Sequence, residues 1–343
     1  AQLADFEPAA WCAAAARWLH GRRAELAPVF AARRALGAVR DGHGDLHLSN
    51  TVVLGDDVTA FDCIEFDPAL RCIDVIADIA FMTMDLHAHG RPDLAHRFLD
   101  AYLAASGDYE GLALLRFHEA ARACVRGLVQ RLGPPADRAG APDYLALATR
   151  RMTEGDARPR LAILCGPSGA GKSTIAARLV DLTGAVRVRS DVERKRLHAT
   201  PTAAEEDASA LYSHAATERT YGRLADCARA VMRAGFDVIV DAAFLDRARR
   251  DAFAALAAEL GVAFVVLSFD APPQELARRV ARRAAAGGDP SDADEAVLAG
   301  QLRSRDPIAP RERARTIRVD TTQAVDVGRL AASWHAHPSS IAG

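Results

Sequence analysis

The stretch Gly166-Pro-Ser-Gly-Ala-Gly171-Lys172-Ser173 decides which fold to expect. It fits the pattern G-x-x-x-x-G-K-[ST] in full, with an apolar run (161–165) before it and an amphipathic run (172–182) after it. Glycines permit the tight path in which successive N–H groups face one anion, and the following helix points the positive end of its dipole at the same place. The pattern predicts a strand, a phosphate-binding loop and a helix. A chance glycine turn is the alternative, which the flanking runs disfavour.

The end of this pattern carries defined chemistry. Lys172 is predicted to reach the β- and γ-phosphates of ATP, and the Ser173 hydroxyl is predicted to ligate Mg²⁺. The chain has one other lysine, Lys195, so a lysine kept in an arginine-rich background indicates a role of its own. ATP and Mg²⁺ are the expected cofactors. The predicted nucleotide-binding residues are Gly166, Pro167, Ser168, Gly169, Ala170, Gly171, Lys172, Ser173 and Thr174.

From residue 161 onward, strand-like runs alternate with helix-like runs. This alternation predicts the α/β class, with a mostly parallel sheet covered by helices on both faces. The predicted strands cover 161–165, 186–189, 236–240, 264–269 and 316–319, and the predicted helices cover 172–182, 208–234, 247–260, 273–286 and 293–303.

The part before residue 153 is predicted to be mostly helical. Helix-like runs cover 9–36, 73–86, 92–105, 112–128 and 142–152, with β-like runs at 51–54 and 58–64 and a strong break at 133–141. A length of 343 residues favours two domains. We expect domains at 1–152 and 161–343, joined by a linker at 153–160.

Two candidate residues follow the second strand of the C-terminal domain, in Ser190-Asp191-Val192-Glu193-Arg194. Side chains at the carboxyl ends of parallel strands line the crevice where ligands bind. Asp191 is predicted to accept the proton of an attacking hydroxyl, and Arg194 to steady a phosphate oxygen. The alternative is that Ser190 or Asp191 caps a helix and Arg194 is solvated.

Further candidates follow along the chain. Asp241 ends the apolar strand Val238-Ile-Val-Asp241 and is predicted to hold the Mg²⁺ water shell, with an ordinary strand-end aspartate as the alternative. Arg279 and Arg283 lie on a helix that precedes a Gly/Asp/Pro/Ser loop, which suits a mobile lid. Their alternative is a solvated helix face, because arginine is common throughout this chain.

The N-terminal part holds a second constellation, His43-Gly-Asp45-Leu-His47-Leu-Ser-Asn50, followed by Asp62. In protein-kinase-like chemistry an aspartate positions the acceptor hydroxyl, while an asparagine five residues later and an aspartate on the next hairpin hold Mg²⁺. Asp45 is therefore a catalytic candidate, and Asn50 and Asp62 are metal candidates. A metal site of His43, Asp45 and His47 is the alternative, but it leaves the spacing of Asn50 and Asp62 unexplained.

Composition excludes few classes of function. The formal net charge of -2 shows no electrostatic footprint for generic nucleic-acid or membrane binding. No apolar stretch approaches the ~20 residues of a membrane span, and no signal peptide is visible. The six cysteines are scattered without a C-x-x-C pair, which favours buried thiols in a reducing cytoplasm.

Residues 161–320 resemble the P-loop kinase family of "predicted kinases" related to polynucleotide kinase, gluconate kinase and zeta toxin. The resemblance lies in GPSGAGKST, SDVERKRL, VIVDAAF, and LARRVARR with GGDPSDAD and Gln301. It implies that Asp191 is the general base, that Arg194 is a substrate or phosphate ligand, and that Arg279 and Arg283 are lid arginines, with Arg278 and Arg282 as adjacent candidates.

The segments HGDLHLSN, FDCIEFDP and DVIADIAF resemble the catalytic loop of aminoglycoside phosphotransferases. The resemblance implies that Asp45 is the base, that Asn50 and Asp62 are metal ligands and that Asp78 braces the loop. A kinase of this fold also needs an N-lobe with a lysine, but no lysine precedes Lys172. We therefore expect an isolated, inactive C-lobe ahead of a P-loop kinase domain, as in a known bacterial fusion.

Three hypotheses of function follow. The leading one is an ATP-dependent kinase acting at the P-loop domain on a hydroxyl of a small molecule or of a nucleic-acid end. The second is an ATP-binding regulator with slow, acceptor-independent turnover. The third is phosphorylation of a small molecule through Asp45. No membrane partner is expected, and the oligomeric state is open.

Overall fold

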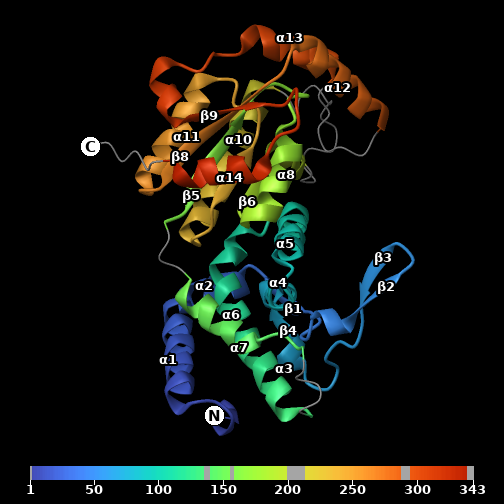
Figure 1. Ribbon diagram of the computed structural model, residues 1–343, viewed down its shortest axis with the longest axis vertical. Coiled ribbons are helices and arrows are strands. Elements are labelled where there is room, and N and C mark those ends of the chain that lie inside the picture. Colours follow the sequence, from blue (N-terminus) through green and yellow to red (C-terminus); the bar gives the residue numbers. More distant parts are fainter. Residues whose placement is uncertain (1, 135–139, 155–157, 199–212, 287–293, 338–343) are drawn as a thin grey trace. The chain divides into compact units, whose positions relative to one another are not determined.

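The computed structural model describes residues 2–134, 140–154, 158–198, 213–286 and 294–337 (Figure 1). The chain divides into two compact units. The first consists of Ala1–Leu99 and Asp108–Ala157, and the second consists of Asp100–Gly107 and Arg158–Gly343. Four predicted segments lie wholly or partly outside the described residues. They are the break at 133–141, the linker at 153–160, the start of the helix at 208–234 and the lid loop. Within the described ranges, none of the helices has the length and apolar character needed to cross a membrane.

The second unit is built on a five-stranded parallel sheet in the order β6-β7-β5-β8-β9. This confirms the predicted α/β class with a parallel sheet flanked by helices. Its strands are β5 (Arg160–Cys165), β6 (Val186–Arg189), β7 (Val238–Asp241), β8 (Ala263–Asp270) and β9 (Thr316–Asp320). Its helices are α8 (Lys172–Thr183), α9 (Ser190–His198), α10 (His214–Arg233), α11 (Arg247–Glu259), α12 (Pro273–Ala286), α13 (Glu295–Ser304) and α14 (Val327–Ala336).

Helices cover both faces of this sheet, so its central strands are mostly apolar. On β5, residues 161–165 are all buried. Helices α8 and α14 pack together over one face, and α10 and α11 pack over the other (Figure 1). A parallel sheet buried on both faces requires continuous apolar strands. Because all five strands run the same way, the loops after β5, β6 and β7 meet at one edge, which is where the site is built.

Two helices of the second unit are absent from the predicted elements, although a helix near Ser190 is the alternative interpretation of Asp191 and Arg194. Helix α9 starts at Ser190, directly after β6, and its sequence SDVERKRLH is so polar that it shows no apolar period. Helix α14 lies after the last predicted strand. The other predicted elements are present with ends that move by at most two residues, except that α10 begins at His214. Helix α8 ends at Gly184, which is left-handed with a φ of 73°.

The first unit is mostly helical. It contains α1 (Ala9–Glu25), α2 (Ala27–Ala35), α3 (Pro68–Arg71), α4 (Val75–Ala88), α6 (Leu112–Leu132), α7 (Tyr144–Thr153) and the larger part of α5 (Pro92–Ser106). Two antiparallel pairs join β1 (Val39–Asp41) to β4 (Cys72–Asp74) and β2 (Thr51–Leu54) to β3 (Asp57–Ala60). Short 3-10 helices cover Gln2–Asp5, Leu48–Asn50, Tyr109–Gly111 and, in the second unit, Pro310–Arg315.

The core of the first unit lies between α4, α6 and α7, where Phe81, Met84 and Leu147 are buried. Two expectations need correction here. The helix predicted at 9–36 is divided at Leu26, which caps the C-terminus of α1 and precedes Pro28. The helix predicted at 73–86 begins at Val75, because the preceding residues pair with β1 and Asp74 caps α4 by accepting a hydrogen bond from the backbone N of Ile76 (3.1 Å).

A buried ion cluster ties the helices of this unit together. Arg33 is 4% exposed and donates to Asp74 (2.7 Å) and to Asp108 (2.6 Å). Burial alone would lower the pKa of Arg33, but the two carboxylates hold it above its ordinary value. The guanidinium is therefore charged and fully paired, as a buried arginine must be.

Candidate active site

The predicted phosphate-binding loop joins β5 to α8. Gly169 and Gly171 are left-handed, with φ of 79° and 81°. A Cβ atom on Gly169 would lie 2.7 Å from the carbonyl oxygen of Leu276, and one on Gly166 would lie 2.6 Å from that of Phe269. Both distances are shorter than a Cβ atom tolerates. Glycine is therefore required here by the backbone conformation of the loop and by the carbonyl groups packed against it.

Lys172 folds back over this loop. Its Nζ donates hydrogen bonds to the carbonyl oxygens of Gly166 and Pro167, both at 2.8 Å. Burial lowers the pKa of Lys172, and the carboxylates of Asp241 and Asp191 oppose that shift. The ammonium group is thus held where a phosphate would meet it, beside two acids.

Asp241 ends β7 next to the start of α8. The residue is 5% exposed, and its Oδ2 is buried without a hydrogen-bond partner in the described structure. Burial raises the pKa of Asp241, while Lys172 and a hydrogen bond from Ser173 act in the opposite direction. An unpaired buried carboxylate oxygen is costly unless a cation joins it. Oxygen atoms of a carboxylate and a hydroxyl are ligands that Mg²⁺ prefers, so Asp241 and Ser173 fit the predicted metal site.

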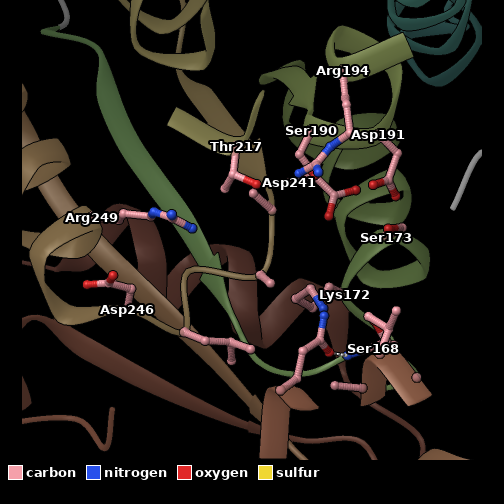
Figure 2. A pocket seen from close by; sticks show the side chains of 18 of the residues that line it. Ser168, Lys172, Ser173, Ser190, Asp191, Arg194, Thr217, Asp241, Asp246 and Arg249 are labelled. Atoms are coloured by element: carbon pink, nitrogen blue, oxygen red, sulfur yellow. Dashed lines mark hydrogen bonds between the residues drawn. The ribbon is translucent and has the colours of Figure 1, made fainter. Parts of the chain in front are cut away.

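Asp191 and Arg194 lie on α9 at the same edge of the sheet. Together with Lys172, Ser173 and Asp241 they line one cavity of about 970 Å³. Figure 2 shows Asp191 and Arg194 pointing toward Asp241, across the opening from the phosphate-binding loop. The structure therefore brings together residues 168–174 of the predicted phosphate-binding loop with Asp191, Arg194 and Asp241.

The cavity has a further wall that sequence reasoning missed, made by α10 and α11. Thr217 and Tyr221 come from α10, and Asp246 and Arg249 come from the start of α11. The Arg249 guanidinium lies 4.3 Å from the centre of the Tyr221 ring. A signal existed, because Asp246-Arg-Ala-Arg249 repeats the Asp-x-x-Arg spacing of Asp191-Val-Glu-Arg194 and also follows a strand end.

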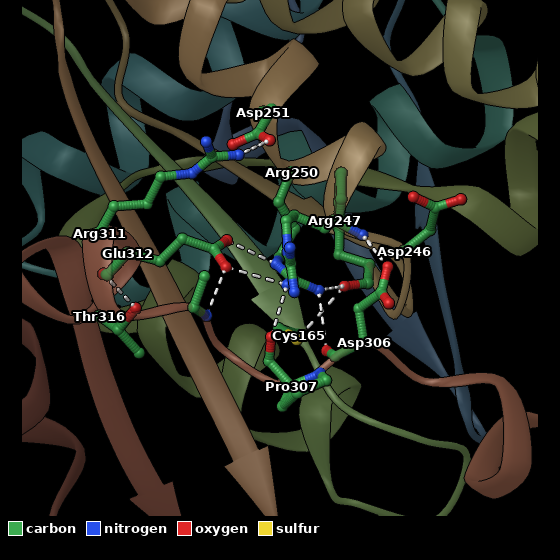
Figure 3. A network of polar contacts seen from close by, with 12 residues as sticks. Cys165, Asp246, Arg247, Arg250, Asp251, Asp306, Pro307, Arg311, Glu312 and Thr316 are labelled. Carbon is green, nitrogen blue, oxygen red and sulfur yellow. Dashed lines mark hydrogen bonds and ion pairs between the residues drawn. The ribbon is translucent and has the colours of Figure 1, made fainter.

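A buried ion pair holds the loop between β7 and α11 (Figure 3). Arg250 and Glu312 have fully buried side chains and are joined by hydrogen bonds of 2.7 and 3.0 Å. Arg250 also donates to the carbonyl oxygens of Phe244 (3.1 Å) and Leu245 (3.2 Å). Phe244 has a φ of 43°, which is unfavourable for this residue type. The network therefore fixes a strained loop whose next residues line the cavity.

Arg279 and Arg283, the two arginines predicted for a lid, differ in what they contact. Arg279 donates to Glu275 (2.6 Å), to the carbonyl oxygen of Gly169 (3.3 Å) and to that of Thr321 (2.7 Å), so it braces the phosphate-binding loop. Arg283 also lines the cavity. Gln301, on α13, accepts a hydrogen bond from the backbone N of Ser168 (2.8 Å). The loop at 287–293, predicted as part of a lid, lies outside the described residues.

In the first unit, the predicted loop is organised around Asp45. The amide of Asn50 donates to the backbone oxygen of Asp45 (3.0 Å) and to its Oδ2 (3.2 Å). A hydrogen bond from His47 lowers the pKa of Asp45. Asp78 accepts hydrogen bonds from the backbone N of His43 (2.8 Å) and of Gly44 (2.9 Å), so it does brace the loop.

Asp62 lies on a segment held against this loop. The N of Phe61 donates to the carbonyl oxygen of Asn50 (3.0 Å), and the N of Ile64 donates to that of His43 (3.0 Å). Asp62 itself is exposed, with a φ of 60°. Within the described residues, no three His, Cys, Asp or Glu side chains gather as a metal-ligand set, so the alternative of a site formed by His43, Asp45 and His47 finds no support.

One protein family and several known proteins are similar to parts of this chain. Residues 161–308 match the protein family described as "AAA domain". The uncharacterized proteins Rv2004c of Mycobacterium tuberculosis and Mb2027c of Mycobacterium bovis are each 33% identical over 299 residues, a match that covers 83% of this chain. The chain spans 60% of the length of these relatives.

Two solved structures each match about half of this chain. A sugar kinase from a Janibacter species is 23% identical with a TM-score of 0.40, and the match covers 54% of this chain and 99% of that one. A putative kinase from Chloroflexus aurantiacus is 18% identical with a TM-score of 0.44, covering 53% and 97%. The resemblance of the N-terminal part to aminoglycoside phosphotransferases stays a prediction. The segment 161–308 is thus similar to the AAA domain family, and its parallel sheet and glycine loop form a P-loop fold.

Proposed function

We propose that the second unit is an ATP-dependent kinase that transfers the γ-phosphoryl group of ATP to a hydroxyl of an acceptor. The observation that carries this proposal is the single cavity lined by Lys172, Ser173, Asp191, Arg194 and Asp241. Phosphoryl transfer asks a protein for positioning and for charge stabilisation more than for covalent chemistry. A phosphate cradle, a metal-ligand pair and a carboxylate facing them meet that demand.

Each group has a role in the proposed reaction. The N–H groups of the loop and Lys172 bind the phosphates. Ser173 and Asp241 would hold Mg²⁺, which supplies charge neutralisation at the β- and γ-phosphates. Asp191 accepts the proton of the acceptor hydroxyl while its oxygen bonds to the γ-phosphorus, and the bond to the leaving oxygen of ADP breaks. Arg194 stabilises the negative charge that the transferring group carries.

The test is ATP turnover by the purified chain, with and without a pool of cell metabolites. We expect turnover that rises with the pool and is lost in Lys172→Ala, because the ammonium group contacts the phosphates directly. Lys195→Ala is the matched control, since Lys195 is the other lysine of the chain, is exposed and does not line the cavity. Asp191→Asn should remove the stimulation by the pool.

The outcomes separate the proposal from its main alternative. Turnover that ignores the pool and survives Asp191→Asn would favour the ATP-binding regulator. Turnover that persists in Lys172→Ala would exclude the phosphate-binding loop as its source.

A further inference from the structure

Two Asp-x-x-Arg turns face each other across the cavity. Arg194 reaches in from α9 and Arg249 reaches in from α11, as Figure 2 shows. Asp246 is used within its own helix, because its Oδ1 accepts a hydrogen bond from the backbone N of Ala248 (2.7 Å) and so caps α11. In the α11 turn, Arg249 therefore points into the cavity, while the carboxylate of Asp246 caps the helix.

The cavity carries more positive than negative charge. Among the described residues that line it, six side chains are lysine or arginine and three are aspartate. Two of the cations, Lys172 and Arg279, are bonded to the phosphate-binding loop. Arg249 stands on the opposite wall and is not bonded to the loop, so the triphosphate does not account for it.

The surroundings of Arg249 suit an anion. Its Nη2 donates to Glu218 (2.9 Å), whose side chain is 55% exposed, and its Nε is buried without a hydrogen-bond partner in the described structure. The Tyr221 ring beneath it is itself held edge-on against Phe244, with centroids 5.2 Å apart. The guanidinium is thus held over an aromatic ring, and its planar fork matches the two oxygens of a carboxylate or a phosphate.

The size of the cavity limits what carries that anion. Ligand sites commonly occupy roughly 300 to 1,000 Å³. The volume of about 970 Å³ has to hold the nucleotide as well as the acceptor. The volume has room for a nucleotide and for a second molecule of the size of a sugar acid or a sugar phosphate.

From these observations we infer that the acceptor is a small alcohol that also bears a carboxylate or phosphate, and that Arg249 binds this anionic group. The inference rests on the proposed kinase function and names its substrate class. Arg249 fixes the anion on the α11 side, so that a hydroxyl elsewhere in the molecule meets Asp191 on the α9 side.

The first experiment measures binding without turnover. The protein is saturated with a non-hydrolysable ATP analogue and Mg²⁺, and inorganic phosphate is titrated by calorimetry at constant ionic strength. We expect binding that weakens about 10- to 100-fold in Arg249→Gln, because a charge-assisted hydrogen-bond pair is lost. Arg318→Gln, an exposed arginine on β9, is the control and should bind as the unaltered protein does. No binding, or equal binding in Arg249→Gln, overturns the inference.

The second experiment compares acceptors that differ in charge. D-gluconate and D-glucose 6-phosphate are each tested against D-glucose for stimulation of ADP release, beside a 5′-hydroxyl oligonucleotide. We expect at least one anionic sugar to exceed glucose, with its KM raised about 10- to 100-fold in Arg249→Gln and less in Arg249→Lys. Unfolding temperatures of both variants show whether the fold is kept.

Failure of this inference is distinct from failure of the kinase proposal. Stimulation by glucose equal to that by its anionic forms, or stimulation by the oligonucleotide alone, overturns the inference while the kinase proposal stands. Absence of any stimulated turnover that depends on Lys172 counts against the kinase proposal, and the phosphate titration then still decides whether Arg249 binds an anion.

Discussion

At the level of single residues, the site contains buried charged groups whose burial costs folding free energy. Asp241 is an acid whose environment opposes its charge, and Lys172 is a base whose environment does the same. The charge of each partly offsets the shift of the other, but burial is the larger effect on both. Charged groups with shifted pKa values are common at functional sites. The bound ligand, here a nucleotide with its metal ion, supplies the interactions that their charges lack.

The Asp241 carboxylate is expected to cost stability in the absence of ligand. Its pKa is raised from 3.8, so the folded state binds the proton more tightly than the unfolded state, and stability is lost as pH rises through the folded pKa. At neutral pH, Asp241→Asn should therefore stabilise the ligand-free protein by about 1 kcal/mol. The same variant should need at least ~10-fold more Mg²⁺ for turnover.

Two measurements check this prediction, namely unfolding in denaturant without ligand and turnover as a function of Mg²⁺ concentration. Unaltered Mg²⁺ dependence in Asp241→Asn would remove the residue from the metal site. The stability difference should shrink when both proteins are unfolded below pH 3.8.

At the level of elements, the phosphate-binding loop depends on its glycines in a way that can be measured. Gly169→Ala forces a left-handed alanine and a Cβ 2.7 Å from the Leu276 carbonyl oxygen, so we expect a loss of about 1–3 kcal/mol in stability and weaker nucleotide binding. Gly222→Ala is the control, because that glycine lies in α10 with open space around it. It should gain about 0.4–1 kcal/mol.

Denaturant unfolding of the two glycine variants measures both changes in the free energy of unfolding, the expected loss in Gly169→Ala and the expected gain in Gly222→Ala. If Gly169→Ala were as stable as Gly222→Ala and bound nucleotide equally well, the path of the loop described above would be wrong.

The loop between β7 and α11 depends on a single buried ion pair. Glu312→Gln leaves the guanidinium of Arg250 buried without its counter-charge, and we expect a loss of about 3–5 kcal/mol. The double variant Arg250→Met, Glu312→Leu removes both charges and should lose less than Glu312→Gln. The comparison is made by denaturant unfolding, and a double variant that is less stable than Glu312→Gln contradicts the prediction.

At the level of the whole molecule, each of the two units has its own buried core and its own set of candidate residues. If the P-loop domain alone performs the chemistry, Asp45→Asn leaves ATP turnover within about twofold, because Asp45 belongs to the first unit, while Lys172→Ala abolishes it. Turnover measured side by side in the two variants decides this. A large loss in Asp45→Asn would instead favour the small-molecule kinase hypothesis for the first unit.

Much of the second unit follows from local patterns in the sequence. The glycine spacing around Lys172 and the continuous apolar runs that become β5 and β8 act over a few residues, so they can be recognised without a structure. Asp191 and Asp241 could be found for the same reason, since each stands at the end of a strand-like run. Helix α9 shows no apolar period because its residues are mostly charged, so only the alternative of a helix capped by Ser190 or Asp191 indicated it.

The sequence by itself determined the α/β class, the phosphate-binding loop and the strand-end acids, because these depend on backbone conformation and short-range periodicity. The Asp-x-x-Arg spacing marks Arg194 and Arg249 in the sequence, but only the tertiary structure decided what the arginines contact. Arginine is common along this chain, so residue type carried no signal, and packing of α11 on Tyr221 turned Arg249 into the cavity. Packing likewise directed Arg279 to the carbonyl oxygen of Gly169 and enclosed Arg250 with Glu312. Those contacts join residues far apart in the chain, which no local pattern encodes.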